Sequence, residues 1–520
     1  MNQGFHLFTI YSPLLLGVWE DADLEGTIVY NRLEERMEHR SGEERYFWWK
    51  GEWRTKSSFF GLVESMEEKL KKAGFAPCQR IGSLLPNSPA FLALCAAAWR
   101  LGGCVVPLNF LAGPGATLRN VQRAELFSVV VPDFAKPQLE LLQEKAGDFP
   151  YSVATLDGEF SLCRGKKQDL ANPEEDHAVI FFTSGTTGNP KAVPLTHGNV
   201  FSNVQAAFEH VPGLGGGKTM FNVLPNFHAF GFTVASILPL LVPDMGEVVV
   251  PSFMPPENTL KVLQETRCTA LVAVPTMIAM LIGAAAKYKP DLSSLELLVS
   301  GGDRFPLRLD EKCERLLGLG VLEGYGLTET SPVVSVNPTY ESKKQGTVGT
   351  LLPGFEAEVR GEDGHVLPPG NDGVLWLRGP SVAREYLGAP DLTRERFQNG
   401  WFNTGDVVRL DEKGYLTVLD RVSDMMIVSG FNVYPQEVEA VLNEHPRVRE
   451  SAVVGVENPI SGQTIKAYVA LHPQEGPELT SREMVAFCRE RLAHYKVPRH
   501  VEFVEDFPRS PIGKILKHQL

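Results

Sequence analysis

The sequence predicts an α/β protein with a large N-terminal domain of doubly wound sheets, a small β-barrel-like subdomain within it, and a smaller α+β C-terminal domain. Up to Gly346, apolar runs of strand length alternate with helix-like stretches, as in parallel sheets covered by helices. After Gly346 the strands become short and are separated by Gly, Pro and Asp, which favours a small antiparallel or barrel-like subdomain. After Arg421 strands and helices mix again. We therefore expect an N-terminal domain at 1–420, with its subdomain at about 346–420, and a C-terminal domain at 421–520.

The clearest unit is the segment 80–109, "RIGSLLPNSPAFLALCAAAWRLGGCVVPLN". A short apolar strand leads into a turn with Asn87 and Pro89, then a helix rich in Ala and Leu that ends at Gly102 and Gly103, and then a second strand. This order predicts a βαβ unit. Other apolar runs, each followed by turn residues and a helix-like stretch, predict strands in "AVIFF" (178–182), "EVVVPS" (247–252), "TALVAVP" (269–275) and "LELLVSG" (295–301).

The C-terminal part has its own strand and helix signals. "ESAVVGV" at 450–456 and "IKAYVALH" at 465–472 predict strands, and a helix is expected from about Ser481. Thr480 and Glu483 have the spacing of a capping box at the start of that helix.

Composition excludes several classes of protein. The chain of 520 residues has a formal net charge of -13 and no cluster of Lys and Arg, which argues against a nucleic-acid partner. Its seven cysteines are scattered without CxxC spacing, so we expect neither disulfides nor a zinc site, and a reducing, cytoplasmic location. The apolar N-terminal stretch "MNQGFHLFTIYSPLLLGVWEDAD" lacks a basic region and a cleavage site, so we expect packed structure rather than a signal peptide. Arg100 and Pro239 interrupt other apolar runs, and no integral membrane segment is expected.

The stretch "FFTSGTTGNPKAVPLTHGNV" at 181–200 is a candidate phosphate loop. It is not a Walker loop: counting from Gly185, Pro190 takes the place of the second Gly, and Lys191 is followed by Ala192. The predicted strand is nevertheless followed by several hydroxyl side chains and by one lysine, a mobile cation. Two glycines there would let backbone N–H groups approach a polyanion. A solvated surface turn would have the same composition.

Three further motifs accompany this loop: "EGYGLTETSP" at 323–332, "GWFNTGDVVRLDEKGYLTVLDRVSDMMIVSGFNVYPQEVEAVL" at 400–442, and "PRSPIGKILK" at 508–517. Together they resemble the adenylate-forming (AMP-binding) superfamily, from about residue 25 to the C-terminus, and most closely its fatty acyl-CoA and acyl-carrier-protein synthetases. The resemblance implies an acid–thiol ligase that joins a medium- or long-chain fatty acid to CoA through an acyl-AMP intermediate, releasing AMP and pyrophosphate. It also implies ATP, Mg²⁺ and coenzyme A, or the phosphopantetheine of a carrier protein, as cofactors.

The resemblance assigns roles in nucleotide binding. The loop would hold the β- and γ-phosphates, Thr328 would contact the α-phosphate, and Glu329 would ligate the magnesium. Asp406 would accept hydrogen bonds from the ribose with Arg421 as its companion, and Tyr325 would stack on adenine. Singly, these residues suit a turn, a surface ion pair or a core tyrosine equally well. The residues expected to contact ATP or AMP are Thr183, Ser184, Gly185, Thr186, Thr187, Gly188, Lys191, Gly302, Asp303, Glu323, Gly324, Tyr325, Gly326, Thr328, Asp406 and Arg421.

Lys514 is the main catalytic candidate, because it matches the family lysine that bridges the substrate carboxylate and the α-phosphate. Thr328, Glu329 and His228 complete the expected catalytic set. In the family the C-terminal domain rotates between the two half-reactions, and the matching hinge is Ser423, where relatives usually carry Asp or Lys. The mobile domain would then present a thiol tunnel lined by the loop of Ser429, Gly430 and Phe431.

Substrate specificity is expected from the acyl pocket. His228 stands where amino-acid-activating relatives have Asp, so an amino acid is disfavoured. Gly326 stands where acetate-using relatives have a plugging Trp, which implies an open pocket. Its candidate lining residues are His228, Phe232, Thr276 and Gly326, together with Phe230 and Val274, although core packing explains them equally well.

Several alternatives stay open at this stage. The acceptor could be an acyl carrier protein, the acid could be aryl, or the chain could be a non-catalytic relative that binds acyl-adenylate. The intact set of Glu329, Asp406, Arg421 and Lys514 favours the enzyme. The expected partners are a small carboxylic acid and CoA.

Overall fold

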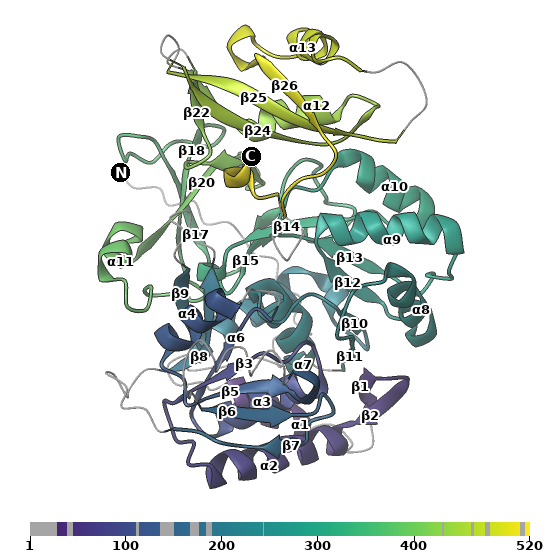
Figure 1. The fold of residues 1–520 in the computed structure, drawn as a ribbon, viewed down its shortest axis with the longest axis vertical. Helices are drawn as coiled ribbons and strands as arrows, with labels where there is room; N and C mark the ends of the chain where they lie inside the picture. The colour runs from purple at the N-terminus through teal and green to yellow at the C-terminus, as the bar shows by residue number, and fades with distance from the viewer. Residues whose placement is uncertain are drawn as a thin grey trace, which may run out of the picture.

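The fold is described from a computed structural model, for residues 29–38, 45–110, 114–135, 150–166, 176–183, 190–242, 244–428, 431–458, 462–473, 479–509 and 515–520. The apolar stretch at 1–23 lies outside these ranges. Figure 1 shows an elongated molecule in which two sheets with their helices form the large part and a smaller unit caps one end.

The first sheet has seven strands in the order β7-β6-β5-β3-β4-β8-β9. Its centre is parallel, and antiparallel pairs close both edges, β6 with β7 and β8 with β9. The strands are β3 (Arg80–Ser83), β4 (Cys104–Pro107), β5 (Ser128–Pro132), β6 (Tyr151–Ala154), β7 (Phe160–Leu162), β8 (His177–Thr183) and β9 (Lys191–Thr196).

The second sheet has nine strands in the order β16-β15-β14-β13-β12-β10-β11-β1-β2. The run from β14 to β1 is parallel, as expected for a doubly wound sheet. The strands are β1 (Arg45–Trp49), β2 (Glu52–Thr55), β10 (Thr219–Asn222), β11 (Gly246–Val249), β12 (Ala270–Ala273), β13 (Leu297–Ser300), β14 (Leu322–Gly326), β15 (Val333–Val336) and β16 (Thr350–Leu351).

Helices cover and separate these two sheets (Figure 1). A stretch of π-helix, η4 (Gly231–Ile237), precedes the short helix α7 (Leu238–Leu241). The other helices of this part are α1 (Val29–Glu38), α2 (Lys56–Lys72), α3 (Pro89–Arg100), α4 (Pro114–Ala124), α6 (His197–His210), α8 (Pro256–Thr266), α9 (Pro275–Tyr288) and α10 (Leu307–Leu317).

Two smaller sheets complete the fold. The third sheet is antiparallel and holds β17 (Glu356–Arg360), β18 (Asp372–Arg378), β19 (Phe397–Gln398), β20 (Trp401–Leu410) and β21 (Leu416–Arg421), with α11 (Pro390–Arg396) beside it. The fourth sheet holds β22 (Met426–Val428), β23 (Phe431–Val433), β24 (Val448–Asn458), β25 (Gly462–Leu471) and β26 (His500–Val504), with α12 (Pro435–Asn443) and α13 (Ser481–Arg489). Sheet membership therefore changes between Arg421 and Met426, next to the expected boundary.

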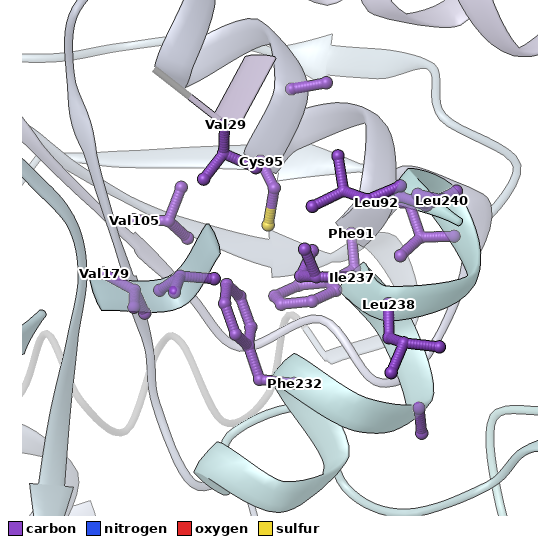
Figure 2. Close-up of a cluster of buried hydrophobic side chains, with 14 of the residues drawn as sticks. Val29, Phe91, Leu92, Cys95, Val105, Val179, Phe232, Ile237, Leu238 and Leu240 are labelled. Atoms are coloured by element: carbon purple, nitrogen blue, oxygen red, sulfur yellow. The ribbon is translucent and has the colours of Figure 1, made fainter. Parts of the chain in front are cut away.

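The largest core lies between the first two sheets. Helix α3 is buried along nearly its whole length, because its Ala- and Leu-rich sequence has no polar face. Figure 2 shows Phe91, Leu92 and Cys95 of this helix packed against Phe232 and Ile237 of η4. This core fixes the two sheets against each other and so positions the loops at their strand ends.

Most of the expected elements are confirmed. The βαβ unit is β3–α3–β4, with parallel register from Arg80↔Cys104 to Ser83↔Pro107. The capping box of α13 is present: the Glu483 N–H donates to Thr480 Oγ1 at 3.3 Å and the Thr480 N–H to Glu483 Oε2 at 2.8 Å. One expectation is wrong. The stretch after the candidate phosphate loop begins with strand β9, antiparallel to β8, and a helix starts only at His197.

All seven cysteines are free thiols, as expected. Across the described ranges, no helix combines the length and the apolar character that crossing a bilayer requires.

Candidate active site

Neighbouring parallel strands bring several expected site residues to one edge of the second sheet. Strands β13 and β14 pair in parallel, with Ser300 opposite Glu323, so the segments that follow them meet at their carboxyl ends. Gly302 and Asp303 follow β13, and Tyr325 is the second-last residue of β14. In open α/β sheets this edge is where ligands bind.

Asp406 is the centre of the first polar group. Its carboxylate is 2% exposed and lies on β20, directly opposite Arg421 of β21. Arg421 Nε lies 3.1 Å from Asp406 Oδ1, and the Tyr325 hydroxyl donates a hydrogen bond to Oδ2. The Asp406 carboxylate raises the pKa of Arg421, and burial together with Asp406 raises the pKa of Tyr325. The structure therefore brings these three expected residues together from three strands.

Glu329 is the centre of the second group. It follows β14 in a short 3₁₀ turn and its side chain is buried. The Tyr386 hydroxyl donates to Glu329 Oε1 at 2.7 Å, and Lys191 Nζ lies 5.2 Å from the centre of the Tyr386 ring. Burial lowers the pKa of Lys191, and the Glu329 carboxylate opposes this change. Glu329 also raises the pKa of Arg421, so the two groups are within electrostatic reach of each other.

Tyr386 and Arg396 are residues that the motifs did not indicate. Arg396 lies at the end of α11, donates to the Thr404 carbonyl two residues before Asp406, and lowers the pKa of Lys191. Tyr386 connects Glu329 to Lys191. Both lie in a segment, 380–396, that carries none of the four motifs, so only the tertiary structure reveals them.

The base of the candidate phosphate loop is described. Thr183 and Lys191 are direct partners at the end of the β8–β9 hairpin. The rest of the predicted loop lies outside the described residues, namely Ser184, Gly185, Thr186, Thr187 and Gly188.

Glu323 and its neighbours form the wall of the site on β14. The Phe305 N–H donates to Glu323 Oε1 at 2.9 Å, and burial raises the pKa of Glu323 to about 7. Gly302 has a φ of +85°, which favours glycine, and it lies beside Val274. Gly324 lies against the Ser335 carbonyl, so a side chain there would crowd β15. Thr328 is half-buried beside Glu329.

The predicted acyl-pocket residues divide into two groups. His228 precedes η4 and is half-buried, and Thr276 is half-buried at the start of α9. Phe230 approaches Gly301, next to Gly302. Phe232, in contrast, is 0% exposed and contacts Phe91, Trp99 and Phe181 in the core (Figure 2). Its assignment to a channel is therefore not supported, because its ring fills the space between the two sheets.

Gly326 is exposed, but the position that a side chain would occupy there is taken by backbone atoms of Pro332. A Cβ atom added there would lie 2.0 Å from the Pro332 carbonyl oxygen. Glycine is thus required by the close approach of β14 and β15. A substitution of Gly326 would shift the backbone, so it cannot report cleanly on the shape of a pocket.

The expected residues of the C-terminal unit are described only in part. Phe431 is 54% exposed and stacks on Tyr495, with ring centroids 4.5 Å apart. The Ser423 hydroxyl donates to Asp424 Oδ1 at 2.9 Å. Lys514, Ser429 and Gly430 lie outside the described residues.

The donor set around Glu329 fits one kind of metal site. Among the described residues no three His, Cys, Asp or Glu side chains come together, so no all-protein metal cage exists there. Mg²⁺ is usually held by one or two carboxylates together with substrate phosphates and water. A single buried carboxylate beside Lys191 matches that mode.

The fold is that of an α/β protein in which these two polar groups lie near the carboxyl edge of a parallel sheet. The chain belongs to the AMP-binding enzyme family, whose model matches residues 33–387. The model of the AMP-binding enzyme C-terminal domain matches residues 437–514.

Similar proteins include a long-chain-fatty-acid–CoA ligase of Escherichia coli O6:H1, 38% identical over 366 residues, which cover 69% of this chain and 64% of the ligase. The match thus spans less than two thirds of that relative. A feruloyl-CoA synthase of Amycolatopsis is 34% identical over 88% of this chain and 91% of its own.

A solved structure, ATP-bound MatB of Rhodopseudomonas palustris, superposes with a TM-score of 0.85 at 28% identity, over 94% of this chain and 98% of MatB. The apo structure of MatB gives a TM-score of 0.76 over 95% and 97%. The protein therefore superposes better on the ATP-bound structure of this relative than on its apo structure.

Proposed function

We propose that this protein is an ATP-dependent carboxylic acid–CoA ligase that acts through an acyl-AMP intermediate. Family membership supports this proposal, and so do relatives that are named as CoA ligases. The expected acid is a medium- or long-chain fatty acid.

The observation that carries the proposal is the convergence of two charged groups. Asp406 with Arg421 provides a buried acceptor suited to ribose hydroxyls, and Glu329 with Lys191 provides an anion and a cation suited to metal-bound phosphates. We infer that a single nucleotide contacts both groups, because Tyr325 of β14 donates to Asp406 and Glu329 lies in the turn that directly follows β14.

In the first half-reaction a carboxylate oxygen attacks the α-phosphorus of ATP. A new C(O)O–P bond forms, the bond between the α-phosphorus and its bridging oxygen to the β-phosphate breaks, and pyrophosphate leaves with that electron pair. Negative charge grows on the phosphate oxygens, so fixed cations are the main source of catalysis. We assign this role to Lys191 and Lys514, with Thr328 as a hydrogen-bond donor. Magnesium, held by Glu329, would neutralise phosphate charge.

In the second half-reaction the thiol sulfur of CoA attacks the acyl carbon, the C–O bond to AMP breaks, and AMP leaves as the thiol loses its proton. We infer that the C-terminal unit rotates about Ser423 before this step, which would bring the loop of Phe431 to the acyl group. Transfer to an acyl carrier protein stays a prediction.

An aryl acid is the second candidate, because the feruloyl-CoA synthase is matched along nearly its whole length. Coverage alone does not decide between the two acids, since a long-chain-fatty-acid–CoA ligase of Bacillus subtilis is 30% identical over 90% of this chain and 91% of its own. The apolar residues Phe230 and Val274, beside the glycines that follow β13, suit an alkyl chain or an aromatic ring.

The test is pyrophosphate release from ATP with acids from acetate to palmitate, benzoate and ferulate, each with CoA, with a carrier protein and with neither. We expect release with alkyl acids that CoA accelerates. Pyrophosphate release only with benzoate or ferulate would establish the aryl acid as substrate. No release with any acid would contradict the proposed ligase activity.

A further inference from the structure

Helix α12 is part of the smaller unit at one end of the molecule (Figure 1), and residues outside that unit contact both ends of the helix. Its own sequence leaves both ends without side-chain caps: Tyr434 at the N-cap makes no capping hydrogen bond, and the last turn has no basic residue. Helix ends carry unpaired N–H and C=O groups that need partners. For α12, one side-chain partner at each end comes from outside its own unit.

Asp420 caps the N-terminal end. It is the second-last residue of β21 in the third sheet and is 1% exposed. Asp420 Oδ2 accepts the Gln436 N–H of α12 at 2.9 Å, and Oδ1 accepts the Arg421 N–H at 2.8 Å. Burial raises the pKa of Asp420, while the Gln436 N–H and Lys517 oppose this. A carboxylate at a helix N-terminus is favourable.

Arg308 caps the opposite end. It lies on the exposed face of α10, beside the second sheet, and its Nη2 donates to the carbonyl oxygen of Glu444, the C-cap residue of α12. A cation at a helix C-terminus complements the partial negative charge of the last carbonyls. The large part of the molecule thus holds α12 at both ends, with the sign of charge that each end requires.

Lys517 extends the N-terminal contact. Its Nζ lies 2.7 Å from Oε1 of Glu439 on α12, and the Val453 N–H donates to the same oxygen at 2.7 Å. Asp420 in turn raises the pKa of Lys517, although burial lowers it. The Asp420 carboxylate thus accepts one N–H from α12 and is stabilised by the charge of Lys517 in the C-terminal segment.

We propose that Asp420 and Arg308 are positioning residues that hold the C-terminal unit in the arrangement required for acyl-AMP formation. The inference rests on the proposed function for the reaction that it serves. A rotation about Ser423 would separate both residues from α12, because Asp420 on β21 and Arg308 on α10 belong to the part that does not rotate. They therefore stabilise one of the two states, the one that resembles ATP-bound MatB.

The experiment compares Asp420→Ala, Asp420→Asn and Arg308→Gln with the parent in two measurements. The first is the distance distribution between dyes on azidophenylalanine at positions 261 and 482, which are exposed on α8 and α13. The second is the ratio of ATP–pyrophosphate exchange to thioester formation from supplied acyl-AMP. Arg315→Gln, on the same helix as Arg308, and Asp391→Asn, on the exposed end of α11, are the matched controls.

We expect Asp420→Ala and Arg308→Gln to broaden the distance distribution and to lower the ratio about three- to thirtyfold, the effect of losing one helix cap. Asp420→Asn keeps an acceptor, so its distance distribution and its ratio should lie between those of the parent and those of Asp420→Ala. The two control variants should match the parent in both measurements. Unchanged distances in folded variants would overturn the proposal, as would changed distances with the parent's ratio. The distance measurement needs no substrate, so it decides the role of the caps even if the proposed ligase activity is absent.

Discussion

At the residue scale, the candidate site is built around two buried carboxylates, Asp406 and Glu329. Asp406 is almost fully buried, yet it has a cation and a hydroxyl donor as partners, which offset the cost of removing a charge from water. The acceptor is thus oriented before a ligand arrives.

Asp406→Asn should weaken ATP binding, because it removes the charge while keeping a carbonyl acceptor. We expect kcat/KM for ATP to fall about ten- to a hundredfold, the range for charge-assisted hydrogen bonds. Pyrophosphate release against ATP concentration is the measurement. Glu356→Gln, which breaks the exposed Glu356–Arg378 pair of the same sheet, should leave kcat/KM unchanged. Equal losses in both variants would show that the effect is not local to the site.

Glu329→Gln should affect magnesium dependence. Loss of the carboxylate is expected to raise the Mg²⁺ concentration for half-maximal rate and to lower kcat about a hundredfold or more. Tyr386→Phe keeps the carboxylate and loses one hydrogen bond, so a drop of about two- to tenfold is expected. Titrations of Mg²⁺ against the rate of pyrophosphate release separate these effects. An unchanged Mg²⁺ requirement in Glu329→Gln would refute the assignment of the metal to this residue.

At the element scale, local patterns predicted the strands that carry the site but not their partners. The βαβ unit at 80–109 and the capping box at Thr480 follow from local sequence and are found. The β8–β9 hairpin was missed, because an apolar run followed by a polar loop has the same pattern whether a strand or a helix comes next. Tyr386 and Arg396 were missed because their roles depend on contacts with residues distant in sequence.

The contact between α1 and α6 gives a prediction about pH. The Val29 N–H donates to His197 Nδ1 at 3.1 Å, and burial lowers the pKa of His197 from 6.5 to about 3. The unfolded chain therefore binds this proton first as the pH falls. The contribution of His197 to the free energy of unfolding is therefore fully present above pH 6.5. Below that pH the free energy of unfolding decreases, by up to about 1.4 kcal/mol per pH unit, until the pH reaches the folded-state pKa of about 3.

His197→Gln should remove this pH dependence. Between pH 6.5 and 5, the free energy of unfolding of the parent should fall by up to about 2 kcal/mol more than that of the variant. Urea titrations at several pH values measure the difference, with each protein referred to its own stability at pH 8. Parallel curves for the two proteins would rule out His197 as the group responsible.

At the scale of the whole molecule, we propose that the arrangement of the two parts determines which half-reaction is possible. The protein superposes better on the ATP-bound structure of a relative than on its apo structure. Sequence patterns predicted a change of fold near residue 421, and sheet membership changes there. The placement of the C-terminal unit against the large part could not be predicted from local patterns, since it depends on contacts such as those of Asp420 and Arg308 with α12.

Lys514→Ala tests the division of labour between the two half-reactions. The variant should lose acyl-AMP formation by about a hundredfold or more, because a cation that neutralises growing charge is removed. Thioester formation from supplied acyl-AMP should be largely intact. The two rates are measured separately, by pyrophosphate exchange and by loss of the free thiol. Equal loss of both would contradict the assignment of Lys514 to one arrangement only.

The central claim is that a carboxylate oxygen attacks the α-phosphorus of ATP, and an isotope measurement tests it most directly. The protein is supplied with ATP, Mg²⁺, CoA and a fatty acid labelled with ¹⁸O in its carboxylate, and the AMP is analysed by mass spectrometry. The account predicts one ¹⁸O atom in each AMP formed. Unlabelled AMP, or label in inorganic phosphate with ADP as the product, would contradict it.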